Sequence, residues 1–208
     1  MIKNYIFDMG GVLPKSTMTE YMKSISHSEA EFTLYQEMTK SNTWVEMDRG
    51  LDIEEACQIF CEQYHHKQDE KIRKFVGNFR QSNDPNPEME QLILESKNHG
   101  YKLYLMSNVS FLYKKFFPYI KSISYMDGIW VSCEQGLIKP DRRAFEDMFH
   151  MFGLTPEECF FIDDSVSNID AGRLCGMDGM VYRGNVAELR SVIREQRRAF
   201  RCTGFCAI

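Results

Sequence analysis

Short apolar runs alternate with amphipathic helical stretches from Glu88 to the end of the chain. Each apolar run is bounded by turn residues, which is typical of a buried strand. Strand–helix alternation implies a parallel sheet with helices on both faces, so we predict an α/β fold. The predicted strands lie at 101–106, 128–133, 159–162 and 180–182, and the predicted helices at 88–99, 111–119, 141–152, 167–175 and 186–200.

A further apolar run lies near the start of the sequence, at Tyr5–Phe7, and ends in Asp8, with Gly10 and Gly11 close behind. Open α/β sheets place their chemistry at the carboxyl ends of the strands, which makes Asp8 a candidate functional carboxylate. The alternative is an ordinary Asp that caps the turn after an edge strand. This stretch alone favours neither interpretation.

The segment between this first strand and the alternating region has helical periodicity and little strand signal. Thr17 and Glu20 have the spacing of a capping box, and Ser28 and Asp52 are further candidate helix starts. We predict roughly four helices here, ended by the break at 83–87. The expected organisation is a helical subdomain at residues 15–83 inserted into a core made of residues 1–14 and 84–208.

Three side chains of the helical segment are candidates for substrate specificity, with Trp44 and Arg49 expected in a loop between helices. Core packing is the preferred role for two of them, Tyr21 and Trp44. Arg49 is the remaining candidate.

Composition narrows the classes of protein. The content of 43% hydrophobic and 26% charged residues in 208 is that of a globular protein, without an apolar run long enough to span a membrane. A net charge of −5 argues against nucleic acid or an anionic membrane as the main partner. Asp8 comes too early for a signal peptide, and the seven cysteines lack C-x-x-C spacing. We therefore expect reduced thiols, a cytoplasmic location and a monomer, with a dimer as the alternative.

Polar groups end three of the predicted strands: Asp8, Ser107-Asn108 and Asp163-Asp164. In a parallel sheet these ends share one edge, where three carboxylates would repel one another unless a cation were present. Carboxylates and a backbone carbonyl suit Mg²⁺, which usually bridges to a phosphate. Lys139, before Pro140, would add a positive charge, and the whole set would suit a phosphoryl group in transfer.

Each of these residues also has an ordinary structural interpretation. Asp163-Asp164 could cap the helix that follows, Lys139 could be a surface lysine, and Ser107-Asn108 could be turn residues. The functional interpretation is preferred because capping needs one residue and would not explain Asp8.

Four segments resemble, in order, the four motifs of the haloacid-dehalogenase superfamily of phosphatases, and the resemblance covers about residues 2–183. It implies a three-layer, Rossmann-like parallel sheet with an inserted α-helical cap, in agreement with the helical segment at 15–83. The motif segments are Phe7-Asp8-Met9-Gly10-Gly11-Val12, Leu105-Met106-Ser107-Asn108, Lys139-Pro140 and Phe161-Ile162-Asp163-Asp164.

The resemblance also implies roles for the motif residues. Asp8 would be the nucleophile that forms an aspartyl-phosphate. Ser107 and Lys139 would hold the phosphoryl oxygens, assisted by backbone N–H groups near Gly10-Gly11 and Asn108. Mg²⁺ would bind Asp8, the Gly10 carbonyl and the pair Asp163 and Asp164, without an indication of which of the pair binds directly.

One position departs from the phosphatase pattern. The superfamily's phosphatases usually carry a second Asp two residues after the nucleophile as general acid and base, and this chain has Gly10 there. General acid–base catalysis by such a residue raises the rate by about 10²–10⁴-fold. A bacterial glucose-1-phosphatase-like branch resembles this chain in having Gly at that place, which favours a substrate with an easier leaving group.

The leading hypothesis is a Mg²⁺-dependent phosphatase that hydrolyses a small phosphorylated metabolite, such as a sugar phosphate, through a phosphoenzyme on Asp8. One alternative is a catalytically weak relative that binds a ligand or partner, which the loss of the acid–base Asp at Gly10 would explain. The other is a dehalogenase-type hydrolase that attacks carbon from the same Asp.

Overall fold

The computed structural model describes residues 1–77 and 85–203. The predicted helical residue Phe79, the first two residues of the predicted break, Asn83 and Asp84, and the end of the tail, 204–208, lie outside the described residues. Within the described parts of the chain, no helix is both long enough and apolar enough to cross a membrane.

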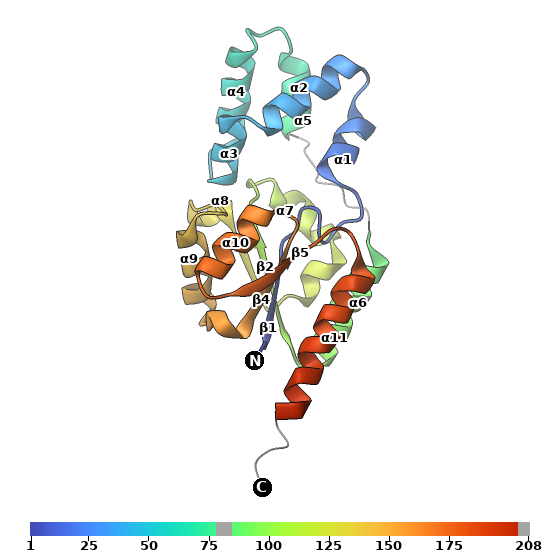
Figure 1. The fold of residues 1–208 in the computed structure, drawn as a ribbon. Coiled ribbons are helices and arrows are strands. Elements are labelled where there is room, and N and C mark those ends of the chain that lie inside the picture. The colour runs from blue at the N-terminus through green and yellow to red at the C-terminus, as the bar shows by residue number, and fades with distance from the viewer. Residues whose placement is uncertain (78–84, 204–208) are drawn as a thin grey trace.

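The centre of the fold is a five-stranded parallel sheet with the strand order β3-β2-β1-β4-β5 (Figure 1). The α/β prediction is confirmed. The first strand of the chain occupies the middle, where Phe7 is in register with Leu105 on one side and Ile162 on the other. The strands are β1 Asn4–Phe7, β2 Lys102–Ser107, β3 Gly128–Val131, β4 Cys159–Asp163 and β5 Asp178–Val181.

Helices cover both faces of the sheet, because successive strand residues point to opposite sides. Tyr5 and Phe7 pack with residues of α6 (Pro87–Asn98) and α11 (Val186–Thr203). Ile6, which points the other way, packs with residues of α9 (Arg142–Phe152) and α10 (Val166–Leu174). The predicted three-layer core is present.

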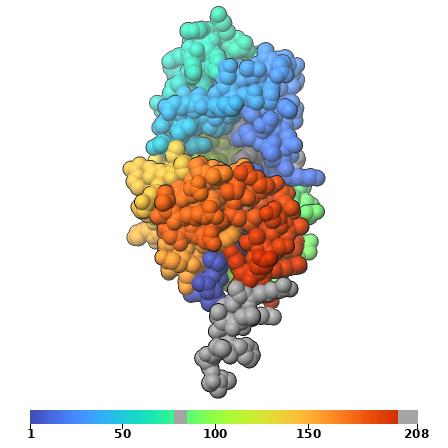
Figure 2. All heavy atoms as spheres, in the orientation of Figure 1, coloured from blue at the N-terminus to red at the C-terminus, as the bar shows by residue number. Residues whose placement is uncertain are grey.

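In the described part of the chain, five helices follow β1 before α6 and stack beyond the carboxyl ends of the strands (Figures 1 and 2). They share an apolar centre in which the rings of Tyr35 and Phe75 stack with their centroids 4.1 Å apart, and the ring of Trp44 stacks on Phe75. The predicted core role of Trp44 is thus confirmed, and Tyr21 packs half-buried against the same core. The helices are α1 Met18–Ile25, α2 Glu29–Thr39, α3 Asn42–Asp48, α4 Ile53–Gln63 and α5 Asp69–Gly77.

The prediction of roughly four helices is one too low for the described residues of this segment, because α3 lies where the sequence predicts a loop. This helix has seven residues and only two buried side chains, Trp44 and Met47, so its apolar periodicity is short. Ser41 caps it, with its side chain accepting from the Trp44 N–H at 3.3 Å. Trp44 therefore lies in a helix, and Arg49 is the C-cap residue of that helix.

Several predicted boundaries shift along the chain. The predicted helix at 111–119 is a short α7 (Tyr113–Phe116) followed by a 3₁₀ turn at Phe117–Tyr119, because Pro118 lacks a backbone donor. The strand predicted at 128–133 ends at Val131, and α8 (Ser132–Gln135) begins directly after it. Strand β5 starts two residues before its prediction, and α11 continues three residues past it.

Candidate active site

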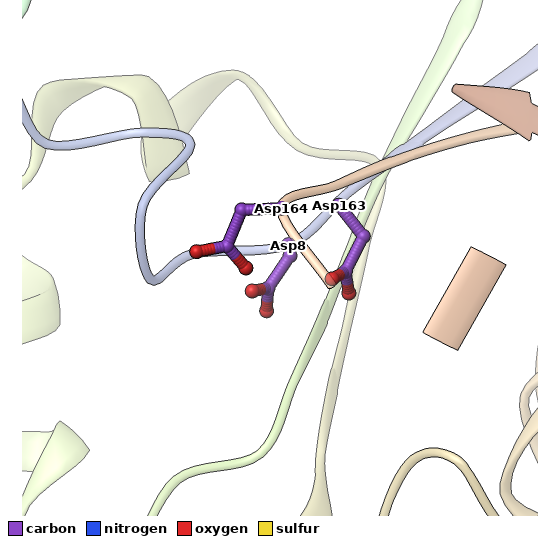
Figure 3. A group of neighbouring side chains, drawn as sticks. All are labelled: Asp8, Asp163 and Asp164. Atoms are coloured by element: carbon purple, nitrogen blue, oxygen red, sulfur yellow. The ribbon is translucent and has the colours of Figure 1, made fainter. Parts of the chain in front are cut away.

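Three of the predicted residues meet at the carboxyl edge of the sheet. Asp8 follows β1, and its backbone N–H donates to the Ile162 carbonyl of β4 at 2.8 Å. Asp163 is the last residue of β4, and Asp164 follows it. One carboxylate oxygen from each of the three lies within 4.8 Å of the others, and Figure 3 shows Asp8 between the other two. The predicted convergence of these groups is therefore present.

Lys139 is buried in the middle of this cluster, with 3% of its surface exposed. Its Nζ donates to Asp8 Oδ1, to Asp163 Oδ2 and to the Met106 carbonyl, each at 2.8 Å. Burial opposes the charge on Lys139, but Asp8 and Asp163 outweigh it and raise the pKa of the ammonium group. The surface interpretation of Lys139 is therefore wrong.

Asn108 holds the loop that carries Lys139. Its side-chain N–H₂ donates to the Lys139 carbonyl at 2.8 Å, and its side-chain oxygen accepts from the Lys139 N–H at 2.9 Å. Both polar groups of the Asn108 side chain are thus bound to the backbone of Lys139. Any contact of Asn108 with a phosphate would therefore use its backbone N–H. Ser107, the last residue of β2, is buried at the same edge with 1% exposure.

The two adjacent aspartates have different surroundings. Asp163 is fully buried, and besides Lys139 it accepts from the Ser165 N–H at 2.8 Å and from Asn168 Nδ2 at 3.0 and 3.1 Å. Asp164 is exposed. Ser165 is the N-cap residue of α10, so neither aspartate occupies the cap position of this helix. Asp163 is saturated with donors, whereas Asp164 faces outward.

Gly11 permits the close approach of Asp164. It adopts the left-handed conformation at φ +67°, and a Cβ built there would lie 2.3 Å from Asp164 Oδ2. Any larger residue would displace that carboxylate. Gly10 is not among the described glycines with positive φ, so its backbone is one that other residues adopt.

The cluster fits a hard divalent cation. Asp8 and Asp164 offer carboxylate oxygens, and among the hydrogen bonds of the described residues none ends on the Gly10 carbonyl. An oxygen-only donor set with two or three carboxylates is the kind that Mg²⁺ accepts. The carboxylates of Asp8, Asp163 and Asp164 therefore lie close enough for such a site, with Asp163 already bound to Lys139, and Gly10 as a ligand stays a prediction.

Burial raises the pKa of Asp8 to about 6, and the Asp163 carboxylate adds to the effect while Lys139 opposes it. Burial also raises the pKa of Asp164, followed by the charge of Asp163. Beyond burial, both shifts reflect the charge balance, because three carboxylates at one strand edge share the buried ammonium group of Lys139. A cation bound there would offset the remaining negative charge.

The sequence interpretation missed two residues near the cluster. Asn168 binds both oxygens of Asp163 from the first turn of α10, and a polar residue five positions after a carboxylate gives no signal of such a contact. Asp48, at the end of α3, was also missed, because the helix itself was not recognised. Its pKa is raised to about 7, first by burial and then by the charge of Asp8.

A pocket of about 450 Å³ opens beside the cluster on its Asp164 side. It carries two cationic side chains, Lys15 and Arg183, and the latter donates to the Asp164 carbonyl at 3.3 Å. The remaining wall mixes polar and apolar groups, including Pro14, Thr17 and Tyr182.

Comparison with characterised proteins places this geometry in a known family. The family model of haloacid dehalogenase-like hydrolases matches residues 2–176. A sesquiterpene phosphatase of Aspergillus oryzae is 26% identical over 92% of this chain and 96% of its own. A flavin mononucleotide hydrolase of Arabidopsis thaliana is 24% identical over 67% of this chain and 56% of its own.

A solved structure resembles the whole fold. An enzyme of the same family from Bacteroides thetaiotaomicron, in complex with magnesium and inorganic phosphate, superposes with a TM-score of 0.69 and 25% identity, over 89% of this chain and 96% of the other. The family match spans most of the sequence and includes all four motif segments. The chain therefore belongs to the haloacid dehalogenase-like hydrolase family, and it is an enzyme of that hydrolase class.

Proposed function

We propose that this protein is a Mg²⁺-dependent phosphatase that hydrolyses a small phosphorylated metabolite through an aspartyl-phosphate on Asp8. The observation that carries the proposal is the cluster itself: a buried carboxylate is held 2.8 Å from a buried ammonium group, beside two further carboxylates suited to a cation. Such a site can neutralise a phosphoryl group while presenting a nucleophile to it. The magnesium and phosphate in the Bacteroides enzyme support the same chemistry.

In this mechanism, Asp8 attacks phosphorus while Lys139 offsets part of the negative charge. Ser107 and the backbone N–H groups of Gly10, Gly11 and Asn108 would hold the phosphoryl oxygens. Asp8, the Gly10 carbonyl and Asp164 would hold Mg²⁺, which supplies charge neutralisation on those oxygens when bound. Asp163, saturated by Lys139, Ser165 and Asn168, would orient the lysine instead of binding the ion directly.

The names of the relatives suggest the substrate class. One acts on sesquiterpenes and another on flavin mononucleotide, so both take a phosphate ester of a small organic metabolite. We propose the same class here, with a sugar phosphate as one member. A pocket of about 450 Å³ with two cations is of a size to admit such a molecule.

A cytoplasmic monomer without nucleic-acid or membrane partners completes the proposal. Two of its cysteines, Cys57 and Cys61, are four residues apart in α4 and are buried in the helical core. Buried unpaired thiols suit a reducing compartment. The net charge of −5 disfavours polyanionic partners.

The test is hydrolysis of p-nitrophenyl phosphate and of a panel with a sugar 1-phosphate, flavin mononucleotide and a terpenyl phosphate. We expect turnover that EDTA abolishes and Mg²⁺ restores. Asp8→Asn should remove at least about 10³-fold of kcat and all acid-stable phosphoenzyme, because the nucleophile is lost. Asp170→Asn, which changes an exposed carboxylate of α10, is the matched control and should keep full activity.

Two outcomes would refute the proposal. Magnesium binding without turnover of any ester in the panel would instead indicate a ligand-binding relative. Metal-independent release of halide from a 2-haloacid, lost in Asp8→Asn, would indicate dehalogenase chemistry.

A further inference from the structure

We propose that Asp48, the last residue of α3, is the general acid and base of this enzyme and replaces the carboxylate that Gly10 lacks. The inference rests on the proposed phosphatase function and adds to it a residue from the inserted helices. It concerns protonation of the leaving oxygen, for which the strand-end cluster offers no proton donor.

The carboxylates of the sheet edge are already committed. Asp163 accepts hydrogen bonds on both oxygens, from Lys139, Ser165 and Asn168. Asp8 is the nucleophile, and Asp164 would be a metal ligand. A side chain that protonates a leaving oxygen at this site would therefore come from outside the sheet edge.

The end of α3 is packed directly on the core next to the site. Gly50 follows this helix with φ +110° and lies against the backbone of Cys133, where a Cβ on Gly50 would be only 2.7 Å from the Cys133 carbonyl oxygen. A Cβ built on Gly136 would lie 4.0 Å from the Arg49 carbonyl oxygen. Cys133 comes two residues after the carboxyl end of β3, whose Val131 is in register with Ser107. This contact holds the C-terminal turn of α3 over the carboxyl edge of the strands.

Asp48 is half-buried in this turn. Within the described residues, its carboxylate has neither a hydrogen bond nor an ion pair, although its neighbour Arg49 pairs with Glu46 at 3.6 Å. The charge of Asp8 acts on Asp48, and the charge of Asp48 acts on Cys133, in agreement with the docking of this turn beside the site. An unpaired, half-buried carboxylate on the turn that docks at this edge is well placed to exchange protons with a substrate bound there.

The charges around Asp48 allow both of its protonation states. Burial and Asp8 raise the pKa of Asp48 to about 7, near the optimum for a group that must donate and then accept a proton at neutral pH. Burial raises the pKa of the Cys133 thiol to about 12, so the thiol stays neutral beside it. Lys139 is bound to Asp8 and Asp163, and Arg49 lies near Asp141, whose pKa it helps to lower.

The chemistry balances in two steps. First, an Asp8 oxygen bonds to phosphorus, the ester P–O bond breaks, and protonated Asp48 gives its proton to the leaving oxygen, which departs as the alcohol. Second, the Asp48 carboxylate takes a proton from water, the water oxygen bonds to phosphorus, and the bond between phosphorus and Asp8 breaks. Inorganic phosphate leaves, with Asp8 ionised and Asp48 protonated as at the start.

The experiment compares Asp48→Asn with Glu46→Gln, a carboxylate of the same helix that pairs with Arg49. The probes are p-nitrophenyl phosphate, with a good leaving group, and glycerol 2-phosphate, with a poor one. Asp48→Asn should lower kcat/KM for the alkyl ester by about 10²–10⁴-fold and for the aryl ester by less than about tenfold. It should also remove the alkaline limb of the alkyl-ester pH profile, while Glu46→Gln stays within about twofold of the unmodified enzyme.

A second pair of variants guards against a purely structural loss. Asp48→Glu keeps the carboxylic acid and should retain part of the activity, and Gly10→Asp added to Asp48→Asn should restore turnover of the alkyl ester. Equal losses on both esters, an unchanged alkaline limb, or no rescue by Gly10→Asp would overturn the role of Asp48. An enzyme inactive on every ester would refute the phosphatase proposal instead, so the two failures are distinguishable.

Discussion

Asp163 and Asp164 are the same residue type, one peptide bond apart, and their surroundings differ completely. Asp163 ends the strand β4 with its side chain turned into the core, where Lys139 and Asn168 meet it. Asp164 is turned outward, against the left-handed turn at Gly11. The alternation of side chains at a strand end therefore divides the pair into an internal anchor for the lysine and an outward-facing oxygen donor.

Gly11→Ala tests the outward-facing half of this arrangement. An alanine at φ +67° is strained, and its Cβ would occupy the space of Asp164 Oδ2. We expect a loss of about 1–2 kcal/mol in unfolding free energy from the strain. We also expect Mg²⁺ binding to weaken by about 10–100-fold, as when a supporting contact of a metal ligand is lost. Urea unfolding and calorimetric titration with Mg²⁺ measure the two effects.

The control for this substitution is Gly153→Ala. That glycine has a similar φ of +62°, but a methyl group added to it would meet no atom within 4 Å, so only the strain is reproduced. Equal Mg²⁺ affinity in both variants would mean that Asp164 does not bind the ion.

At the scale of elements, the loop between α8 and α9 decides where Lys139 lies. The loop enters α9 through Asp141, whose side chain accepts from the Arg143 N–H at 3.0 Å and binds the Arg143 guanidinium. These hydrogen bonds, first from the side chain and then from the backbone of Arg143, lower the pKa of Asp141 to about 2. The helix start thus depends on an ionised carboxylate.

Asp141→Ala should lower the unfolding free energy by about 1 kcal/mol at pH 7, the usual cost of losing such a cap. The pKa of Asp141 in the folded state lies below its ordinary value of 3.8, so the ionised form stabilises the fold above that value. The difference from the unmodified protein should therefore shrink as the pH falls from about 4 towards 2. Urea unfolding at a series of pH values measures it.

Asp141→Asn separates the two contributions, because it keeps a capping oxygen without the charge. It should retain most of the stability at pH 7. A difference between Asp141→Ala and the unmodified protein that stays constant down to pH 3 would contradict the assignment.

Elements with strong patterns could be predicted from the sequence, and weakly patterned ones could not. The apolar run at β1 and the turn at Gly11 place Asp8 at a strand end without further information. Helix α3 carries only two buried side chains, which is too few to distinguish it from a loop. The contacts of Asp163 with Asn168, and of Asn108 with Lys139, depend on loop geometry that neither periodicity nor composition encodes.

At the scale of the molecule, the inserted helices lie beyond the carboxyl edge of the sheet that carries the site (Figures 1 and 2). Gly50 is one point where these two parts meet closely, against the Cys133 carbonyl. How an inserted layer docks on a core is a property of the assembled surfaces, so the sequence did not reveal that Asp48 lies near Asp8. The boundaries of the inserted layer at 15 and 83 stay predictions.

Gly50→Ala tests this docking contact. A methyl group there must push the end of α3 away from the core, and misplacement by about 1 Å can cost on the order of 10²-fold in rate. We expect kcat/KM to fall by about 10–100-fold on an alkyl phosphate. Gly100→Ala, at φ +87° with no atom within 4 Å, reproduces the strain alone and should stay near full activity. Equal rates for the two variants would show that the end of α3 takes no part in catalysis.

The central place of β1 in the sheet has a consequence for synthesis of the protein on the ribosome. Its two neighbours, β2 and β4, begin only at Lys102 and Cys159. At about 5–20 residues per second, roughly 8–30 s pass between the emergence of Asp8 and that of Asp163. The strand Asn4–Phe7 lacks both partners until β2 emerges, and it lacks β4 for the whole of that time, exposed to chaperones and to other nascent chains. The carboxylate that we propose as the nucleophile is therefore made well before Lys139 and Asp163, which surround it in the folded protein.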